Sequence, residues 1–191
     1  MRNLVIEGKY VRLEEIAPKH FEYIIKWRNN PELNKFLNQP FELTMELQQK
    51  WYERYLKDFS QGLMVLVDKT NNVPFGTMGW TDYNPDEKIC ISGRVLVGDE
   101  NYRGGRELTE AVIVFSDFLY DHLSLKNMYG FVADDNKKII SWNKRLGFKK
   151  NTDLLRFPNE KCVNGISQSE YIRSKEEYLK IREKIIKLLD Y

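Results

Sequence analysis

The sequence predicts a single α/β domain in which one mixed β-sheet is flanked by helices on both faces. The length of 191 residues suits one domain with a sizeable core. Segments of strand-like alternation crowd the middle of the chain, while segments of helical period first precede them and later alternate with them. Because no internal repeat, low-complexity tract or linker divides the chain, we assign residues 1–191 to one domain.

The N-terminal half alternates between strand and helical patterns. Pro31 ends the first helix, because the residue before a proline disfavours the α region. Thr44 is a possible N-cap for the second helix, which is expected to run on to Phe59. The expected elements are a half-buried strand or tight hairpin around Gly8 over residues 4–16, helices over 21–28 and 44–59, and strands over 62–69 and 73–83.

A long helix that begins at Arg106 is the most clearly marked element of the C-terminal half. Its apolar side chains recur at i, i+3, i+4 and i+7, so one face should lie on the sheet. These side chains are Leu108, Ala111, Val112, Phe115, Phe118, Leu119 and Leu123. Gly147 is expected to end a later, short helix as its C′ residue. The further elements expected are strands over 88–98, 127–134 and 148–157, a short helix over 135–147, a returning strand before residue 175, and a C-terminal helix over 175–191 whose apolar side holds Tyr178, Ile181, Ile185, Leu188 and Leu189.

Composition and charge argue against several classes of protein. The 30 basic and 28 acidic side chains leave a net charge of +2, and no run of lysine or arginine indicates a nucleic-acid partner. The first apolar run is too short for a signal peptide and no later run approaches the ~20 residues that span a bilayer, so we expect a cytoplasmic protein with no membrane partner. Cys90 and Cys162 lie far from His20 and His122, so we expect reduced, buried thiols rather than a disulfide or a metal site.

The junction VGDENYRGGRELTEAV, residues 97–112, leads from an apolar strand through two adjacent glycines into the long helix. Such a junction presents free backbone N–H groups at the positive end of a helix dipole, where a phosphate can bind. Gly104 and Gly105 would let a ligand approach the backbone, and Arg103 and Arg106 add cations. Neither of the two common nucleotide-binding glycine signatures is present. The alternative is that the glycine pair merely turns the chain.

The order of elements and motifs, namely strand, YRGG, long helix, strand, ADDN, short helix and RLGF, resembles the GNAT family of acetyl-CoA-dependent N-acetyltransferases. The pyrophosphate loop of that family commonly reads R-G-x-G-x-G, which Arg103 and Gly104 match. The resemblance covers nearly the whole chain, and the segment VRLEEIAPKHFEYIIKWRNNPE looks like the branch of ribosomal-protein and amino-sugar N-acetyltransferases. It implies the GNAT fold, a mixed and mostly antiparallel sheet with a central splay, and acetyl-CoA as co-substrate without a metal.

The resemblance also implies which residues hold acetyl-CoA. The strand that ends at Leu96 and Val97 would offer free backbone groups to the pantetheine arm and, as an oxyanion hole, to the thioester oxygen. Asn136 would face the cofactor through its side-chain amide. The full set of implied contacts is Leu96, Val97, Arg103, Gly104, Gly105, Arg106, Glu107, Leu108, Thr109 and Asn136. Arg106 and Leu108 stand where the family usually repeats glycine, although nucleotide-linked amino-sugar acetyltransferases of bacteria tolerate a similar loop.

Three residues are candidates for catalysis. Asn143 occupies the position where many family members carry a tyrosine acid, and its amide has no proton to transfer near neutral pH. Ser141 lies on the same short helix near the thiol, and Ser92 sits where relatives often have a glutamate. For each of them a structural or solvated role is the alternative. In that case the reaction depends chiefly on positioning and has no dedicated base.

The acceptor side is expected at the end of the first helix. The resemblance implies that Trp27, Arg28 and Asn29 border the acceptor pocket, and Tyr83, at the end of a strand, is a further candidate. For Trp27 the alternative is simple core packing.

Together these features predict an enzyme that moves an acetyl group from acetyl-CoA to a primary amine. Direct attack without an acyl-enzyme is favoured, because both cysteines lie off the predicted loop. The amine is expected in a small metabolite such as an amino sugar. The alternatives are a peptide amine, as in N-terminal acetylation of ribosomal proteins, and a CoA-binding module that has lost catalysis. The protein is expected to act as a monomer or homodimer.

Overall fold

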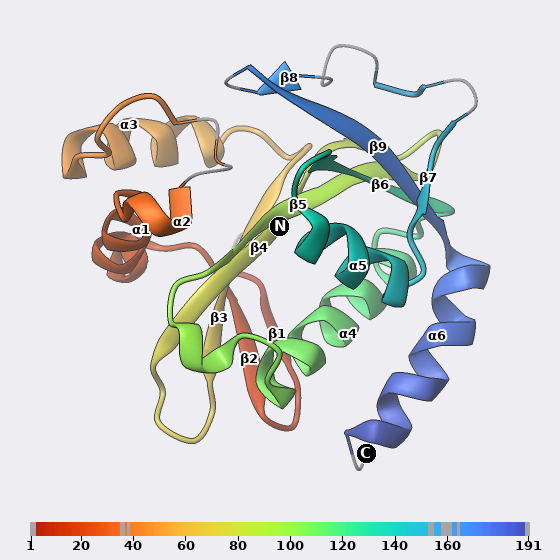
Figure 1. The fold of residues 1–191 in the computed structure, drawn as a ribbon. Helices are drawn as coiled ribbons and strands as arrows, with labels where there is room; N and C mark the ends of the chain where they lie inside the picture. The colour runs from red at the N-terminus through yellow and green to blue at the C-terminus, as the bar shows by residue number, and fades with distance from the viewer. Residues whose placement is uncertain are drawn as a thin grey trace.

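A mixed sheet organises the computed structural model (Figure 1), which describes residues 3–34, 37, 39–152, 155–157, 162–163 and 165–189. The strand order is β1-β2-β3-β4-β5-β6-β9-β7, with β8 paired to β9. The strands are β1 (Val5–Glu7), β2 (Val11–Glu15), β3 (Gly62–Asp68), β4 (Pro74–Asn84), β5 (Ile89–Val97), β6 (Asn127–Ala133), β7 (Lys149–Lys150), β8 (Cys162–Val163) and β9 (Ile166–Ser174). Only β5 and β6 are parallel among the described pairs, which confirms the mixed, mostly antiparallel sheet.

Helices cover both faces of this sheet, as the sequence predicts (Figure 1). Those on one face are α1 (Phe21–Arg28), α2 (Pro31–Asn34) and α3 (Met45–Tyr55), and those on the other are α4 (Arg106–Asp121), α5 (Lys137–Arg145) and α6 (Lys175–Leu188). Side chains of β3 alternate between the two faces of the sheet. Met64 and Leu66 pack with apolar residues of α4, and the intervening Leu63, Val65 and Val67 pack with α1 and α3. None of the described helices is long and apolar enough to cross a membrane.

Local signals place several helix ends where the sequence predicts them. Thr44 caps α3, because its Oγ1 accepts a hydrogen bond from the N–H of Leu47 at 3.2 Å. Gly147 follows α5 with a φ of 84°, the left-handed conformation of a C′ glycine. Two 3-10 turns, η1 (Pro18–His20) and η2 (Glu100–Tyr102), precede α1 and α4.

The second helix is shorter than predicted. α3 ends at Tyr55, and Phe59 lies beyond it with 66% of its surface exposed. The Oδ1 of Asp58 accepts hydrogen bonds from the N–H of Ser60 at 3.0 Å and from its hydroxyl at 2.6 Å. Such a local turn competes with the helix and directs the chain into β3.

The strand predicted over residues 148–157 is wrong in its extent, because among its described residues only β7, residues 149–150, pairs with β9. Three described residues beyond β7 donate to the carboxylate of Glu170 instead. The N–H groups of Arg156 and Phe157 donate to that carboxylate at 3.1 and 2.9 Å, and the side-chain amide of Asn151 donates to it as well. Residues 153–154 lie outside the described residues.

The apolar side of the C-terminal helix is also corrected at one position. Leu188 is 82% exposed, whereas Leu189 is buried at 7%. Leu188 is the last residue of α6 and Leu189 is its C-cap, so the chain turns at the helix end and exposes Leu188 although that position falls on the predicted apolar side.

A buried carboxylate joins β2 to η1. Glu14 accepts hydrogen bonds from Arg12 Nε at 2.7 Å and from Lys19 Nζ, and His20 Nε2 lies 3.2 Å from it. Burial raises the pKa of Glu14, but Lys19 and Arg12 outweigh burial and bring the pKa from 4.5 to about 2. The folded state therefore favours the ionised carboxylate.

Glu14→Gln is expected to lower the free energy of unfolding by about 1–2 kcal/mol at neutral pH. Because the folded pKa lies below the unfolded one, the difference from wild type should be complete above about pH 4.5 and vanish as the pH falls towards 2. Urea denaturation at pH 7, 5 and 3 measures it. Glu46→Gln, at an exposed pair with Lys50, is the matched control and should stay near zero. A difference that does not change with pH would contradict the assignment.

Candidate active site

The pairing of the central sheet stops between β5 and β6. The two strands pair only from Ile89 opposite Asn127 to Ile91 opposite Tyr129. Beyond that point β5 continues beside β4, and β6 continues beside β9. This divergence is the splay that the resemblance implies, and it leaves the facing edges of both strands without a strand partner.

A β-bulge shapes the β5 side of the splay. Arg94 and Val95 together lie opposite the single residue Met78 of β4. Arg94 has a φ of 54°, and its carbonyl accepts a hydrogen bond from Thr77 Oγ1 at 2.9 Å. The extra residue inverts the alternation of the strand, so Leu96 packs with α1 and α3. Leu96 thus lies in the core, 8% exposed.

Backbone groups of Val97 point into the splay. The N–H of Gly98 donates to the carbonyl of Phe75 at 2.8 Å, so residue 98 directs its N–H to the β4 side. Alternate residues of an antiparallel strand direct both backbone groups to the same neighbour. The N–H and C=O of Val97 therefore face the opposite side, where β6 has diverged.

The loop between β5 and α4 has the conformation of an anion site. Gly104 has a φ of 75°, and a Cβ there would meet no atom within 4 Å, so its outer side is open. Gly105 is the N-cap of α4, and its carbonyl accepts the N–H of Thr109 at 3.1 Å. The first-turn N–H groups of residues 106–108 have no acceptor within the helix. This loop can therefore bind a phosphate at the positive end of a 16-residue helix.

Side chains of the β3–β4 hairpin hold this loop in place. Tyr102 stacks on Phe75 with ring centroids 4.2 Å apart, and its hydroxyl donates to Asp68 at 2.9 Å. Arg106 lies over the Tyr10 ring at 4.4 Å and donates to Glu107 at 2.8 Å. The carboxylate of Glu107 raises the pKa of Arg106.

The other side chains predicted to contact acetyl-CoA lie in different environments. Arg103 is exposed, and Leu108 is 7% exposed in the core. Asn136 caps α5 through its Oδ1, which accepts the N–H of Ile139 at 3.2 Å, and its amide N–H₂ donates to no other described residue. Thr109 donates its hydroxyl to the carbonyl of Gly105 at 2.8 Å.

The residues predicted on the acceptor side have structural contacts. Trp27 is 5% exposed, and a Cβ on Gly98 would lie 2.2 Å from its ring, so the indole packs directly on the start of the loop. Asn29 bonds the backbone of Leu43 through both amide atoms, at 2.9 and 2.8 Å. Arg28 donates to Gln39 at 2.6 Å.

Tyr83 lies near the end of β4, at a second irregularity of the β4–β5 pairing, and its hydroxyl donates to the carbonyl of Leu123 at 3.1 Å. The three catalytic candidates are not brought together by contacts among the described side chains. Ser92 is half-buried one residue past the last β5–β6 pair, Ser141 is exposed on α5, and Asn143 is half-buried on α5. Their catalytic roles stay predictions.

A cysteine nucleophile is disfavoured at the one thiol that the structure describes. Cys90 is fully buried, and burial raises its pKa from 9.0 to about 12, so the thiolate does not form at neutral pH. The side chain of Cys162 lies outside the described residues. Within the described part of the chain, no three histidine, cysteine, aspartate or glutamate side chains are arranged to bind a metal.

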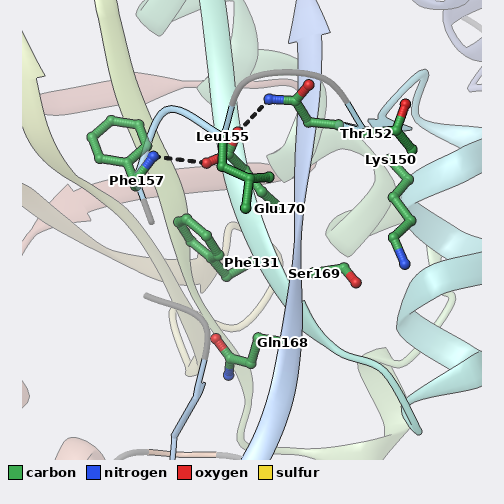
Figure 2. A pocket seen from close by; sticks show the side chains of 9 residues that line it. Phe131, Lys150, Thr152, Leu155, Phe157, Gln168, Ser169 and Glu170 are labelled. Carbon is green, nitrogen blue, oxygen red and sulfur yellow. Dashed lines mark hydrogen bonds between the residues drawn. The ribbon is translucent and has the colours of Figure 1, made fainter. Parts of the chain in front are cut away.

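A pocket of about 270 Å³ opens beside the splay (Figure 2). Phe131 of β6 and Glu170 of β9 line it, together with Phe157 from the segment that follows β7. Met128 and Val132 pack towards α4, so the alternating residue Phe131 lies on the opposite face, the face of α1 and α3. The buried carboxylate of Glu170, 3% exposed, accepts the N–H of Phe157 (Figure 2).

Arg94 is the functional candidate that sequence reasoning missed. It is a charged residue in the otherwise apolar strand ISGRVLV, which is the available signal. Simple alternation gives no indication of the bulge that sets the direction of its side chain.

Comparisons with known proteins agree with this geometry. The family model described as acetyltransferase (GNAT) domain matches residues 11–149. No curated protein matches the sequence significantly.

Three similar solved structures illustrate the shared fold. A GCN5-related N-acetyltransferase from Brucella melitensis has a TM-score of 0.80 at 18% identity, covering 99% of this chain and 86% of that chain. The apo form of FdhC, described as a nucleotide-linked sugar GNAT, has a TM-score of 0.77 at 17% identity, covering 98% and 99%. The spermidine N-acetyltransferase from Vibrio cholerae, in complex with CoA and spermine, has a TM-score of 0.76 at 16% identity, covering 90% and 99%.

Proposed function

We propose, from the premise that this chain belongs to the GNAT acetyltransferase family, that it transfers the acetyl group of acetyl-CoA to the primary amine of a small metabolite such as an amino sugar. Family membership makes the protein an N-acetyltransferase. The observation that carries the proposal is the pairing of an open splay, into which Val97 directs its backbone groups, with an anion loop at the start of α4. In the same proposal, residues 1–191 form one domain that works in the cytoplasm as a monomer or homodimer, without nucleic acid.

The residues present fit acetyl-CoA, which supplies an acetyl thioester when bound. The open side of Gly104 and the first-turn N–H groups of α4 would hold its phosphates, with Arg103 as a further cation. The N–H of Val97 would donate to the thioester oxygen, on which negative charge develops during transfer. The free amide N–H₂ of Asn136 would orient the cofactor from the other side of the splay.

The acceptor amine must lose its proton before it attacks, because an amine of pKa about 8–10 is mostly protonated at neutral pH. Ser92, Ser141 and Asn143 have no side-chain hydrogen bond among the described residues and lack an ionisable group near neutral pH. We therefore assign them to orienting water or substrate, and attribute the rate chiefly to positioning and backbone electrostatics. Direct attack is supported by the protonated thiol of Cys90.

Free CoA, released from acetyl-CoA in the presence of a panel of amines, tests the proposal. The panel holds an amino sugar, its nucleotide-linked form, a peptide with a free N-terminus, and spermidine, and mass spectrometry identifies the acetylated product. We expect an amino-sugar amine to be acetylated. Acetylation of the peptide alone would favour a protein N-terminal acetyltransferase. If no amine reacts while acetyl-CoA still raises the melting temperature, the chain is a CoA-binding module.

A further inference from the structure

Arg94 places a guanidinium group on the face of the sheet that carries α1 and α3. Its Nη2 donates to Gln61 Oε1 at 2.6 Å, and its guanidinium carbon lies 6.0 Å from the Trp51 ring of α3. The residue sits on the β5 bulge with a φ of 54°, a strained conformation for a residue other than glycine. Strain of this kind is often retained at binding and catalytic sites.

The guanidinium of Arg94 is incompletely paired. Its Nη1 is inaccessible to solvent and has no hydrogen-bond partner. Among the described residues it forms no ion pair, and the side chain that accepts from it is the neutral amide of Gln61. A buried cationic donor without a partner is unfavourable unless something supplies the missing acceptor.

A second arginine on the same face has a similar environment. Arg28, at the end of α1, is half-buried and donates to the neutral amide of Gln39 at 2.6 Å. Burial lowers the pKa of Arg28 and of Arg94, and the charge of Arg28 lowers the pKa of Arg94 further. The carboxylates of Asp82 and Asp58 raise the pKa of Arg94, but neither forms an ion pair with it among the described residues. An anionic group would supply the acceptor that the buried Nη1 of Arg94 lacks.

We propose that Arg94, supported by Arg28, binds an anionic group of the acceptor, so that the substrate is an amine that also carries a phosphate or a carboxylate. This inference rests on the proposed acetyl transfer. The anion loop for acetyl-CoA leads into α4, which lies on the opposite face from α1 and α3, so Arg94 is left for the second substrate (Figure 1). Val97 lies three residues after Arg94 along the strand, a span of about 10 Å that one small molecule can bridge.

Matched acceptor pairs test the role of Arg94 and separate the two sources of the anion. The phosphate arm compares a nucleotide-linked amino sugar with the free amino sugar. The carboxylate arm compares an amino acid with its amide. In at least one arm, wild type should favour the anionic acceptor in kcat/KM by tenfold or more, with spermidine the poorest substrate of all.

Arg94→Gln should lower kcat/KM for the anionic acceptor about 30-fold, chiefly through KM, and leave the neutral acceptor and the KM for acetyl-CoA unchanged. Arg94→Lys should restore part of the preference, because it keeps the charge but loses the planar fork. Arg54→Gln, an exposed arginine of α3, is the matched control and should behave as wild type. Circular dichroism and melting temperature show whether each variant folds.

Calorimetric titration of the same acceptors into the protein with CoA provides a readout that does not require turnover. Wild type should bind the anionic acceptor more tightly than its neutral partner, and Arg94→Gln should lose this difference. That result supports the inference even if no amine is acetylated. A lack of acetylation would contradict only the proposed function. Acetylation of neutral and anionic acceptors at equal rates, with Arg94→Gln lowering both alike, would overturn the role of Arg94 and leave acetyl transfer intact.

Discussion

Glu110→Gln is expected to lower the free energy of unfolding by about 3 kcal/mol, because one backbone donor would lose its buried acceptor at about 1–3 kcal/mol and two others would lose a charged acceptor. Glu110 of α4 is fully buried, and its carboxylate accepts the N–H groups of Lys9, Tyr10 and Val11 at 2.6, 2.7 and 2.8 Å. Lys9 and Tyr10 lie in the turn between β1 and β2, and Val11 begins β2. Tyr10 and Val11 donate to the same oxygen, so a glutamine carbonyl there would keep both, while its N–H₂ group would face the N–H of Lys9.

Urea unfolding at pH 7, followed by circular dichroism, measures this loss. The control is Glu46→Gln in α3, which makes the same chemical change at an exposed glutamate and should alter the free energy by no more than about 0.5 kcal/mol. Hydrogen exchange should also accelerate at the three donor amides before it changes in β4 or β5. Equal stability of wild type and Glu110→Gln would show that the hairpin does not depend on this carboxylate.

Glu110 also shows where sequence reasoning stops. The period of apolar residues predicts α4 and its buried side, and Phe115 and Leu119 are buried accordingly. Periodicity assigns a charged residue to the solvent, yet Glu110 lies inside because its partners come from a hairpin about 100 positions earlier in the chain. No local pattern contains that information.

The same limit applies to the strands. Alternation predicts β3, β4 and β5 as strands, but it also predicts an unbroken alternation of faces along β5. The bulge at Arg94 and Val95 inverts the faces, and it depends on pairing with β4. Beyond β7, the attraction of Asn151, Arg156 and Phe157 to Glu170 overrides the strand pattern of the sequence.

Part of the candidate site could be predicted from the local sequence, and part of it could not. The anion loop is marked locally, because a glycine pair between a strand and a helix restricts the backbone to few conformations, and the φ of 75° at Gly104 agrees with that reading. Roles that depend on where a ligand sits carry no such local signal. Those of Ser92, Ser141 and Asn143 therefore remain predictions, while the contacts of Asn29 and Tyr83 arise from distant segments.

Gly104→Val is expected to abolish the stabilisation by acetyl-CoA, which for wild type amounts to about 4 kcal/mol at a ligand concentration of 1,000 times Kd. A Cβ at Gly104 would extend from the open side of the loop, where the proposed ligand approaches. A β-branched side chain also disfavours the φ of 75°, so the loop itself should shift. Strain alone should lower the stability of the free protein by about 2 kcal/mol.

Gly165→Val separates strain from ligand binding, because Gly165 has a φ of 76° and equally open surroundings but lies in the β8–β9 turn. Both variants should lose similar stability without ligand, yet only Gly104→Val should lose the rise in melting temperature with acetyl-CoA. Pantetheine, which lacks the phosphates, should stabilise wild type far less than acetyl-CoA does. If Gly104→Val kept the full rise, or if pantetheine matched acetyl-CoA, the phosphates would not bind at this loop, and the start of α4 would serve only to turn the chain.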